Sequence, residues 1–331
     1  MNLRRHLLIV FGTAPITVAL GRTATAAQQP TSAVRIGYLG GLSRSDDAAR
    51  IEALRQGLRE FGYVEGRNVV IEGRWAAGKI DRLPAFAAEL VSLKVDVIVT
   101  AGSIATSAAK AATSTIPIVM TNESDPVANR VIASLARPGG NITGLSNFVP
   151  ELVAKRLEIL REVVPKLSRV SVLWSSSSAG YAQMKSEVER AAKVFNLQLQ
   201  YLDILESRDV APAFQSAAKW RSDAALVLDA TVIVSHRKQI IELAATYRLP
   251  VMYHQTRFVE DGGLMVYGVS IVDHTRRAAT FVDKILKGAK PADLPVQQPT
   301  TFELVVNMKT AKALGITFPP EIMARVSRVI Q

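Results

Sequence analysis

The sequence predicts an α/β protein with two doubly wound lobes, each built on a parallel sheet, joined by a hinge of several segments. From Val34 onward, short β-branched runs alternate with helical periodicities, which is the pattern of parallel βαβ units. The length of 331 residues allows roughly two domains. In addition, the order and spacing of strand, Ala-rich helix and Pro-containing strand in 95–120 recur in 224–253, and such a weak internal repeat favours two lobes of similar architecture.

The first series of elements runs from Val34 to a dense cluster of turn residues at 137–141. Ser45 is expected to cap the first helix, and Asp125 followed by Pro126 is the pattern of a further helix start. The expected strands and helices alternate along this half. They are strands 34–39, 68–74, 95–99 and 116–120 and helices 45–61, 83–91 and 104–113, placed by period-2 or 3.6-residue spacing of apolar side chains.

The second series continues with the same alternation. Its expected helices are 152–163, 181–195, 210–220, 235–246 and 275–286, and its expected strands are 170–174, 198–202, 224–228, 264–269 and 302–307. The segment after the second series is too short for a third domain, so it must complete the first two. We therefore expect lobe 1 to be 34–146 completed by about 270–298, and lobe 2 to be 147–269 completed by about 299–331.

The first 26 residues have the pattern of a secretory signal peptide, 1–26. A basic stretch at Arg4 and Arg5 precedes an apolar run, 7–20, too short to span a bilayer, and small residues follow up to Ala26. No later apolar run reaches about 18 residues. We therefore expect export, cleavage near Ala26, and a mature periplasmic chain that is not embedded in a membrane. Sec export is favoured over the twin-arginine route, because the residues around the Arg pair match that route poorly.

Composition excludes several classes of function. The chain has no Cys, which removes disulfides, thiolate nucleophiles, Cys-type zinc, iron–sulfur ligation and a lipoprotein anchor. The formal charge is +11, but Lys and Arg are dispersed among acids, so we expect no nucleic-acid partner.

No catalytic constellation is present in the sequence. Nucleophile-elbow, P-loop and dinucleotide motifs are missing. His236, His254 and His274 lie about 20 residues apart without a metal-ligand spacing. We expect no enzyme, no metal and no cofactor; an exported hydrolase would need a nucleophile and base that the sequence does not supply.

Several long motifs carry a family resemblance that covers essentially all of 34–331. They are Asp81-Arg82-Leu83-Pro84, the run 135–144 (LARPGGNITG), the run 258–268 (FVEDGGLMVYG) and the run 284–295 (KILKGAKPADLP). Together they resemble the ABC-transporter substrate-binding family of the tryptophan/tyrosine type. The resemblance implies a periplasmic-binding-protein type I fold, hinge closure on a small ligand, and delivery to an ABC permease in the inner membrane with its cytoplasmic ATPase.

Open α/β sheets bind ligands beyond the carboxyl ends of their strands, so candidate ligand residues directly follow predicted strands. Ser103 begins a helix, where free N–H groups favour a carboxylate, and Asp229 ends an apolar strand, where it suits a ligand ammonium. Capping is the competing role for both, and Tyr181 and Tyr253 could instead pack as core aromatics. The full candidate set is Leu42, Ser43, Gly102, Ser103, Asn122, Asn147, Ser176, Tyr181, Asp229 and Tyr253, with Thr143, Gly144 and Gly268 as hinge residues.

The sequence departs from the family pattern at two places that bear on the ligand. Relatives that carry amino acids tend to have Asp-Asn where this chain has Asp229-Ala230, and many have Asn-Pro in place of Ser175-Ser176. Whether the ligand carries an ammonium therefore stays open between an aromatic or branched amino acid and a related organic acid.

The resulting functional prediction is the periplasmic solute-binding component of an ABC uptake system. The ligand is expected to be small and to bear a carboxylate. The alternative is a sensor component whose closed form is presented to a membrane receptor. A monomer is the default expectation.

Overall fold

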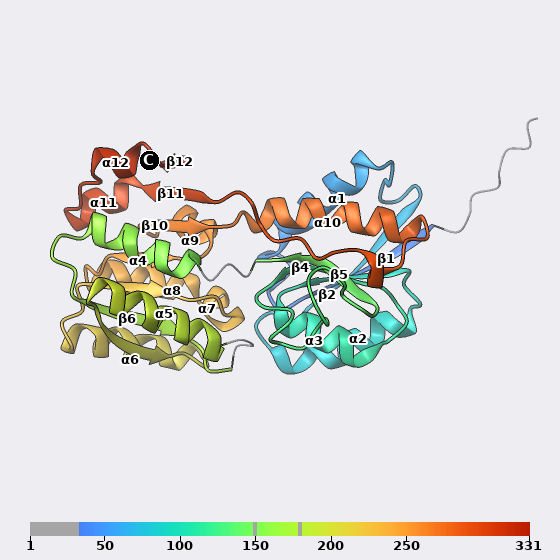
Figure 1. Cartoon of the computed structure of the whole chain (residues 1–331), viewed down its shortest axis with the longest axis horizontal. Coiled ribbons are helices and arrows are strands. Elements are labelled where there is room, and N and C mark those ends of the chain that lie inside the picture. The colour runs from blue at the N-terminus through green and yellow to red at the C-terminus, as the bar shows by residue number, and fades with distance from the viewer. Residues whose placement is uncertain (1–32, 148–150, 178–180) are drawn as a thin grey trace, which may run out of the picture. The chain divides into compact units, whose positions relative to one another are not determined.

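The computed structural model describes residues 33–147, 151–177 and 181–331, and the expected signal peptide, 1–26, lies outside them. Within these residues the named strands form a five-stranded and a seven-stranded sheet. We call the five-stranded sheet with the helices packed on it lobe 1, and the seven-stranded sheet with its helices lobe 2 (Figure 1).

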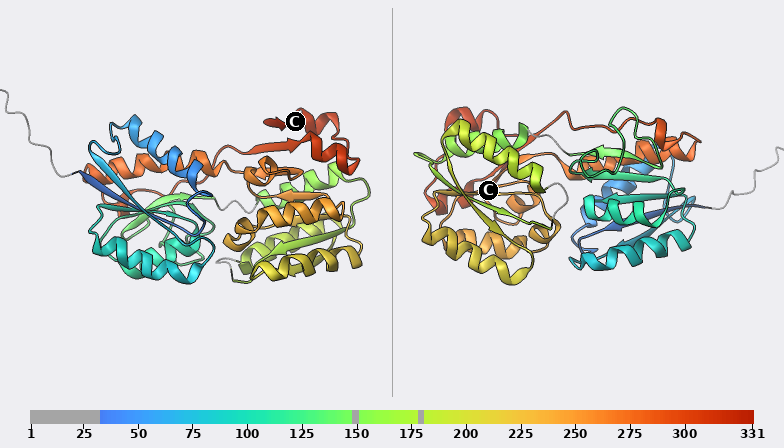
Figure 2. Two further views of the ribbon diagram at one scale, coloured as in Figure 1. Left: turned by 180° about the vertical axis from the view of Figure 1, so that it is seen from behind. Right: turned by 60° about the horizontal axis from the view of Figure 1, so that its bottom comes forward.

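Lobe 1 is a wholly parallel sheet in the order β2-β1-β3-β4-β5, covered by helices on both faces. Helices α1 and α10 pack on one face and α2 and α3 on the other, and Figure 2 shows α1 and α10 side by side from behind. The elements are β1 (Val34–Gly40), α1 (Ala48–Glu60), β2 (Val69–Trp75), η1 (Ile80–Arg82), α2 (Leu83–Ser92), β3 (Val97–Ala101), α3 (Ser103–Ala112), β4 (Ile118–Glu123), β5 (Ile142–Ser146), α10 (Ile271–Leu286) and η2 (Pro291–Asp293).

Lobe 2 has the sheet order β12-β11-β10-β9-β8-β6-β7. Helices α4, α5, α11 and α12 cover one face, and α6 to α9 cover the other. The elements are α4 (Glu151–Val163), β6 (Arg169–Trp174), α5 (Tyr181–Phe195), β7 (Gln198–Asp203), α6 (Ser207–Lys219), β8 (Ala224–Val227), α7 (Thr231–Ser235), α8 (Arg237–Thr246), β9 (Val251–Tyr253), α9 (Thr256–Glu260), β10 (Met265–Gly268), β11 (Glu303–Asn307), α11 (Met308–Leu314), α12 (Pro320–Met323) and β12 (Arg328–Ile330).

The two sheets share one topology. In lobe 1 the first strand is flanked by the second and third, and in lobe 2 the strand β6 is flanked by β7 and β8 with β9 and β10 following. This common order explains the internal repeat seen in the sequence and confirms the prediction of two doubly wound lobes. The predicted all-parallel sheet needs one amendment, because β11 runs antiparallel to β10.

The chain passes between the lobes at three places among the elements described. It leaves lobe 1 after β5, returns between β10 and α10, and leaves again between η2 and β11. The last passage starts beside β5, where Leu145 bridges Gln297. Hinges are a few loop or element-terminal residues that absorb large changes in φ and ψ, so these three passages are the candidate hinge segments.

Three local predictions were wrong for identifiable reasons. Helix α1 begins at Ala48 rather than after Ser45, because Ser43, not Ser45, accepts the backbone N–H of Asp46 (3.1 Å) and tightens the loop. Asp125 accepts the N–H groups of Val127 and Ala128, yet only a turn follows it. The helix expected over 235–246 is two helices, α7 and α8, which meet at His236.

Two of the expected hinge glycines occupy positions with tight backbone contacts. Gly144 lies inside β5 at φ +130°, and a Cβ there would sit 2.2 Å from the Met120 carbonyl oxygen. Thr143, beside it, donates to the Leu294 carbonyl at 2.7 Å. Gly268 ends β10, where a Cβ would lie 2.8 Å from the His254 carbonyl oxygen. At these positions the backbone therefore lies too close to a neighbouring segment to admit a larger residue in place of either glycine, and both glycines lie next to a passage between the lobes.

Candidate ligand-binding cleft

Each sheet offers a topological switch point, where the strand order reverses and loops diverge. In lobe 1 this point lies between β1 and β3, followed by Gly41-Leu42 and Gly102-Ser103. In lobe 2 it lies between β6 and β8, followed by Ser175 and Asp229. Sheet topology therefore points to the same loops as the sequence did.

Residues from the loops at both switch points line a first cavity. Five predicted residues line it: Leu42, Gly102, Ser103, Asn122 and Asp229. Leu42 is 4% exposed and packs with the core of lobe 2 although it follows β1 of lobe 1. Its side chain therefore ties the two lobes together at the cavity edge.

A second cavity adjoins the first and shares Ser124, Asp229 and Gln255 with it. Apolar side chains supply much of its wall, with a few polar groups among them. Its lining includes Asn147, Leu152, Val153, Arg156, Met184, Leu228 and His254. Apolar walls with a few convergent polar groups are the usual character of a small-molecule site.

Asp229 lies where the two cavities meet, and the hydrogen bonds of its carboxylate are long. Its oxygens lie 3.4 Å from Nε2 of Gln255 and 3.5 Å from Nδ2 of Asn147. Nε2 of His254 is 3.2 Å away but lacks hydrogen-bond alignment. Burial works to raise the pKa of Asp229, but His254, Arg50 and Arg156 outweigh it and hold the pKa below its ordinary value. The group is thus an ionised carboxylate with capacity for a further donor.

On the lobe 1 wall, the polar side chains are hydrogen-bonded to other groups of the same lobe. The hydroxyl of Ser103 lies 2.9 Å from that of Ser124 and accepts the Ser124 backbone N–H at 3.1 Å. Burial raises the pKa of Glu123, which is fully buried nearby and accepts the amide of Asn129 at 2.8 Å. A protein carboxyl group therefore already lies beside the start of α3, where the sequence placed a ligand carboxylate.

Arg156 is a site residue that the sequence reasoning missed. It is 9% exposed on α4, its Nε donates to the Tyr267 carbonyl at 2.7 Å, and it lines the second cavity. Burial lowers its pKa to about 10. A signal was available, because Arg156 falls on the apolar face of its helix, between Val153 and Leu157.

Four other predicted residues lie away from both cavities. Ser43 bonds Asp46 at 2.7 Å, and Ser176 bonds Asp203 at 2.6 Å. Tyr181 is 42% exposed and lies against Trp174. Tyr253 is 1% exposed and stacks on Phe258 in the core of lobe 2, at 4.7 Å between ring centroids. The competing explanation of aromatic packing therefore fits Tyr253.

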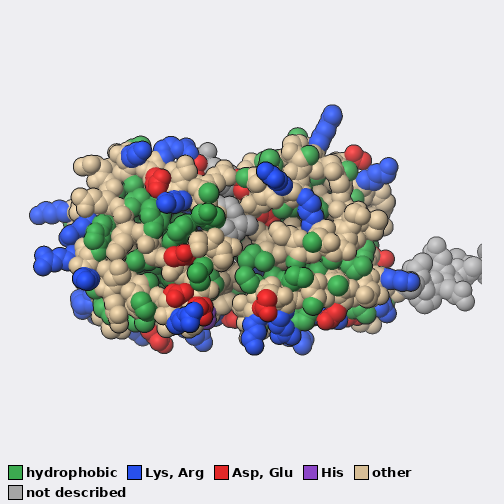
Figure 3. Space-filling model, turned by 90° about the horizontal axis from the view of Figure 1, so that it is seen from below, with side chains coloured by type: hydrophobic (Ala, Val, Ile, Leu, Met, Phe, Trp, Pro, Cys, Tyr) green, Lys and Arg blue, Asp and Glu red, His purple; other side chains and the backbone are tan. Residues whose placement is uncertain are grey.

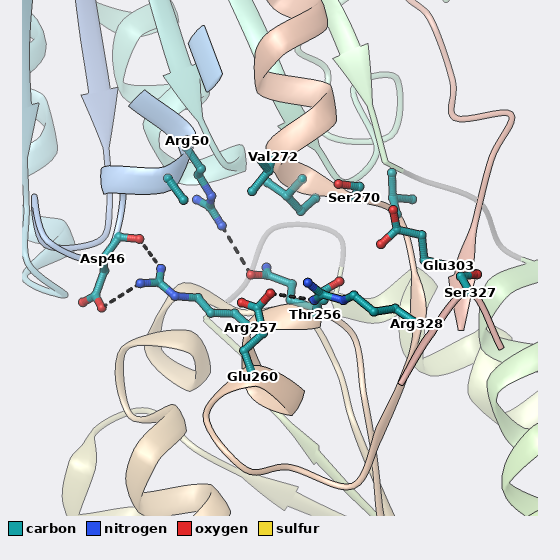
Figure 4. A pocket seen from close by; sticks show the side chains of 14 residues that line it. Asp46, Arg50, Thr256, Arg257, Glu260, Ser270, Val272, Glu303, Ser327 and Arg328 are labelled. Carbon is teal, nitrogen blue, oxygen red and sulfur yellow. Dashed lines mark hydrogen bonds and ion pairs between the residues drawn. The ribbon is translucent and has the colours of Figure 1, made fainter. Parts of the chain in front are cut away.

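A third cavity of about 420 Å³ lies beside the passage from β10 to α10 (Figure 4). Gln255 lines all three cavities, and Arg50 lines the first and third. Arg50 donates to Gln255 at 3.3 Å and to Asp47 at 3.1 Å. Arg50 and Gln255, joined by a hydrogen bond, are therefore shared by the walls of the first and third cavities.

Charged contacts between the lobes border the third cavity. Asp46 of lobe 1 pairs with Arg237 at 2.9 Å and with Arg257 at 3.3 Å, both from lobe 2. Burial opposes ionisation of Asp46, but the hydrogen bond from Ser43 and the two guanidinium groups hold its pKa below the ordinary value. These pairs hold the two lobes directly against each other.

The surface matches the dispersed charge of the sequence. On the face in Figure 3, Lys and Arg side chains stand around the outline among Asp and Glu rather than in one stripe. In the part of the chain that the structure describes, no group of three His, Asp or Glu could hold a metal ion, and no helix is long and apolar enough to cross a membrane.

Comparison with known proteins now decides the family. A model of the ABC transporter substrate binding protein family matches residues 43–330. The chain belongs to this family. Its members bind substrates and are not enzymes, and the two lobes have the periplasmic-binding-protein type I fold that the motifs implied.

Individual relatives support this assignment. A tyrosine-binding protein of Clostridioides difficile is 27% identical over 259 residues, which cover 78% of this chain and 74% of that protein. The crystal structure of an ABC domain in complex with L-Trp from Streptococcus pneumoniae is 26% identical, with a TM-score of 0.84, covering 90% of this chain and all of that one.

A third relative is a ligand-free, open substrate-binding protein with adhesive properties from Clostridium difficile. It is also 26% identical, covering 90% of this chain and 99% of that one, but its TM-score is 0.67. At equal identity, the described structure is thus more similar to the L-Trp complex than to the open form.

Proposed function

We propose that this protein is the periplasmic solute-binding component of an ABC uptake system. The signal-peptide pattern at 1–26 supports export, and the family supports delivery to a permease served by a cytoplasmic ATPase. Lobe 1 (34–146 with about 270–298) and lobe 2 (147–269 with about 299–331) would close over the solute about the three chain passages. We expect the protein to act as a monomer.

The proposed ligand is a small carboxylate-bearing metabolite, either an aromatic or branched amino acid or a related organic acid. The observation that carries this proposal is Asp229, a half-buried, ionised carboxylate with only long hydrogen bonds at the junction of two cavities. A ligand ammonium would complete its hydrogen bonding, because a buried charge without a full set of partners is costly. Relatives named for tyrosine and crystallised with L-Trp favour the amino acid.

Closure of the two lobes over the solute couples binding to transport. Asp229 belongs to lobe 2, and Asn147 next to it begins a passage from lobe 1. Ser124 of lobe 1 lines both cavities that Asp229 lines. A solute at Asp229 is therefore enclosed by groups from both lobes only when the lobes meet, and it favours that state by its differential affinity.

Thermal unfolding of the mature protein with a panel of amino acids and deaminated acids tests the proposal. A ligand that binds only the folded state stabilises it by RT ln(1 + [L]/Kd), so a true ligand at 100 times its Kd adds about 2.7 kcal/mol. L-tyrosine, L-tryptophan, L-leucine and their deaminated analogues form the first panel. Retention of the chain in the cytoplasm, or stabilisation by none of a broad solute set, would contradict it.

The genes that adjoin this one distinguish uptake from sensing. Adjacent permease and ATPase genes are expected for uptake. A neighbouring membrane receptor without them would support the sensor role, in which the same closed form is presented to that receptor.

A further inference from the structure

Arg156 is buried with no carboxylate at ion-pair distance, although Asp229 acts on it at longer range. Among the described residues it takes part in no ion pair within 4 Å, and its Nε donates to a neutral carbonyl, that of Tyr267. Arg50, the other buried arginine at the cleft, is paired with Asp47 at 3.1 Å. Buried cations are normally paired, so Arg156 is the cleft group with most to gain from an anion.

The backbone around Arg156 is shaped to keep its guanidinium at the cavity. The bond to the Tyr267 carbonyl fixes Nε, which leaves the other edge of the planar fork for a second acceptor. Gly268, the next residue, provides the space, because a Cβ there would lie 3.3 Å from Nη2 of Arg156.

The start of α3 is the competing place for a ligand carboxylate. There, Ser103 is bonded to Ser124, and the carboxyl group of Glu123 is buried close by. A second carboxylate at that point would face Glu123. The second cavity also has carboxylates in its lining, Asp229 and Glu187, but Glu187 is paired with Arg190. The same cavity adds a buried cation, Arg156, and apolar side chains.

Resting on the proposed function, we propose that Arg156 binds the carboxylate of the ligand while Asp229 binds its ammonium. The ligand class is then an α-amino acid held by its zwitterionic head. Both charged contacts come from lobe 2, Arg156 on α4 and Asp229 after β8. Leu152, Val153 and Met184 would receive apolar parts of the side chain. Lobe 2 alone can therefore bind the head group first, and lobe 1 then closes over it.

Isothermal titration of four proteins with two probes tests this assignment. The proteins are the wild type, Arg156→Gln, Arg156→Lys and Ser103→Ala; the probes are L-tyrosine and L-tyrosinamide, which lacks the carboxylate. Arg156→Gln should weaken L-tyrosine by about 10- to 100-fold, the usual range for losing a hydrogen bond to a charged group. L-tyrosinamide should bind the wild type weakly, and its affinity for Arg156→Gln should be no lower. Arg156→Lys should recover part of the loss, since it keeps the charge without the fork.

The outcomes separate this inference from the proposed function. Equal loss of both probes in Arg156→Gln, or a loss of L-tyrosine in Ser103→Ala as large as in Arg156→Gln, would overturn the role of Arg156. If the wild type binds no L-tyrosine, the same comparison uses L-leucine and L-leucinamide. A wild type that binds solutes but gains nothing from a carboxylate overturns the inference alone, whereas one that binds no solute overturns the proposed function.

Discussion

The two walls of the cleft differ in how completely their polar groups are satisfied. On the lobe 1 wall, Ser103 is bonded to Ser124 at 2.9 Å, and Asn122 accepts from Thr121 at 3.1 Å. On the lobe 2 wall, Asp229 has hydrogen bonds of 3.4 Å and longer, and Arg156 donates to a carbonyl only, among the residues described. Normal hydrogen bonds span about 2.7–3.2 Å. Among the residues that line the cavities, those of lobe 2 therefore have the greater unused hydrogen-bonding capacity, although Oε2 of Glu123, behind the lobe 1 wall, also lacks a partner among the described residues.

This difference suggests that one wall gives the cleft its shape and the other recognises the ligand. A satisfied polar wall is rigid and gains little from a ligand, because each of its hydrogen bonds would have to be exchanged for another. Buried charged groups with too few partners lower the stability of the unliganded protein, and a ligand that supplies the missing partner therefore binds more tightly. We therefore expect lobe 1 to shape the cleft and lobe 2 to select the ligand, and substitutions in each lobe can test that division.

The largest expected effect concerns His274, which, like Oε2 of Glu123, is a buried group behind the lobe 1 wall with no hydrogen-bond partner among the described residues. It is 2% exposed on α10, and neither ring nitrogen has a hydrogen-bond partner among the described residues. Burial, helped by Arg277, lowers its pKa to about 4. Because the unfolded chain binds this proton near pH 6.5, stability is fully present above that pH and is lost as the pH falls through about 4. The loss should reach roughly 3 kcal/mol.

Urea unfolding between pH 7 and pH 4 measures this loss. His274→Gln should flatten that part of the curve, whereas His236→Gln, at a half-buried position, should leave most of it. Parallel curves for the wild type and His274→Gln would show that other groups carry the pH dependence.

The next largest effect is expected at Asp229 on the lobe 2 wall. Asp229→Asn should shift preference from L-tyrosine toward its deaminated analogue by about 1–3 kcal/mol, because the ligand ammonium loses its charged partner. Calorimetric titration with both compounds gives the difference. Asp223→Asn is the matched control, since that carboxylate is already bonded to Ser168 and Arg169 at 2.8–3.0 Å. Equal losses for the two ligands in Asp229→Asn would make Asp229 a structural residue.

A smaller effect is expected where the lobes touch directly. Asp46→Asn removes the charge that faces Arg237 and Arg257, so the closed state becomes less favourable. We expect about 1 kcal/mol weaker binding of every ligand, with selectivity unchanged. Glu60→Gln, which breaks an exposed pair with Arg276 inside lobe 1, is the control and should leave affinity alone. If affinity falls as much in Glu60→Gln as in Asp46→Asn, the loss comes from the change in net charge and not from the contact between the lobes.

The sequence predicts the architecture well because it depends on patterns that repeat. Strand and helix periodicities, together with the repeated strand-helix-strand unit, define two similar sheets, and strand ends such as Asp229 then follow from sheet geometry. Arg156 was missed because its role depends on the Tyr267 carbonyl, 111 residues away along the chain, and on space at Gly268. The hydrogen bond from Arg50 to Gln255 joins the two lobes across 205 residues of chain, and no local pattern encodes that contact.

The smallest effect is expected at Ser103 on the lobe 1 wall, and it tests the division most directly. Ser103→Ala removes an acceptor for the Ser124 N–H and a partner for its hydroxyl, which should cost about 0.5–1 kcal/mol of folding stability. If lobe 1 only shapes the cleft, L-tyrosine and L-tyrosinamide should lose the same small amount of affinity. Titration of both ligands, with urea unfolding of the unliganded protein, gives the three numbers. A loss confined to L-tyrosine would move the carboxylate to the start of α3, and recognition would then be shared between the walls.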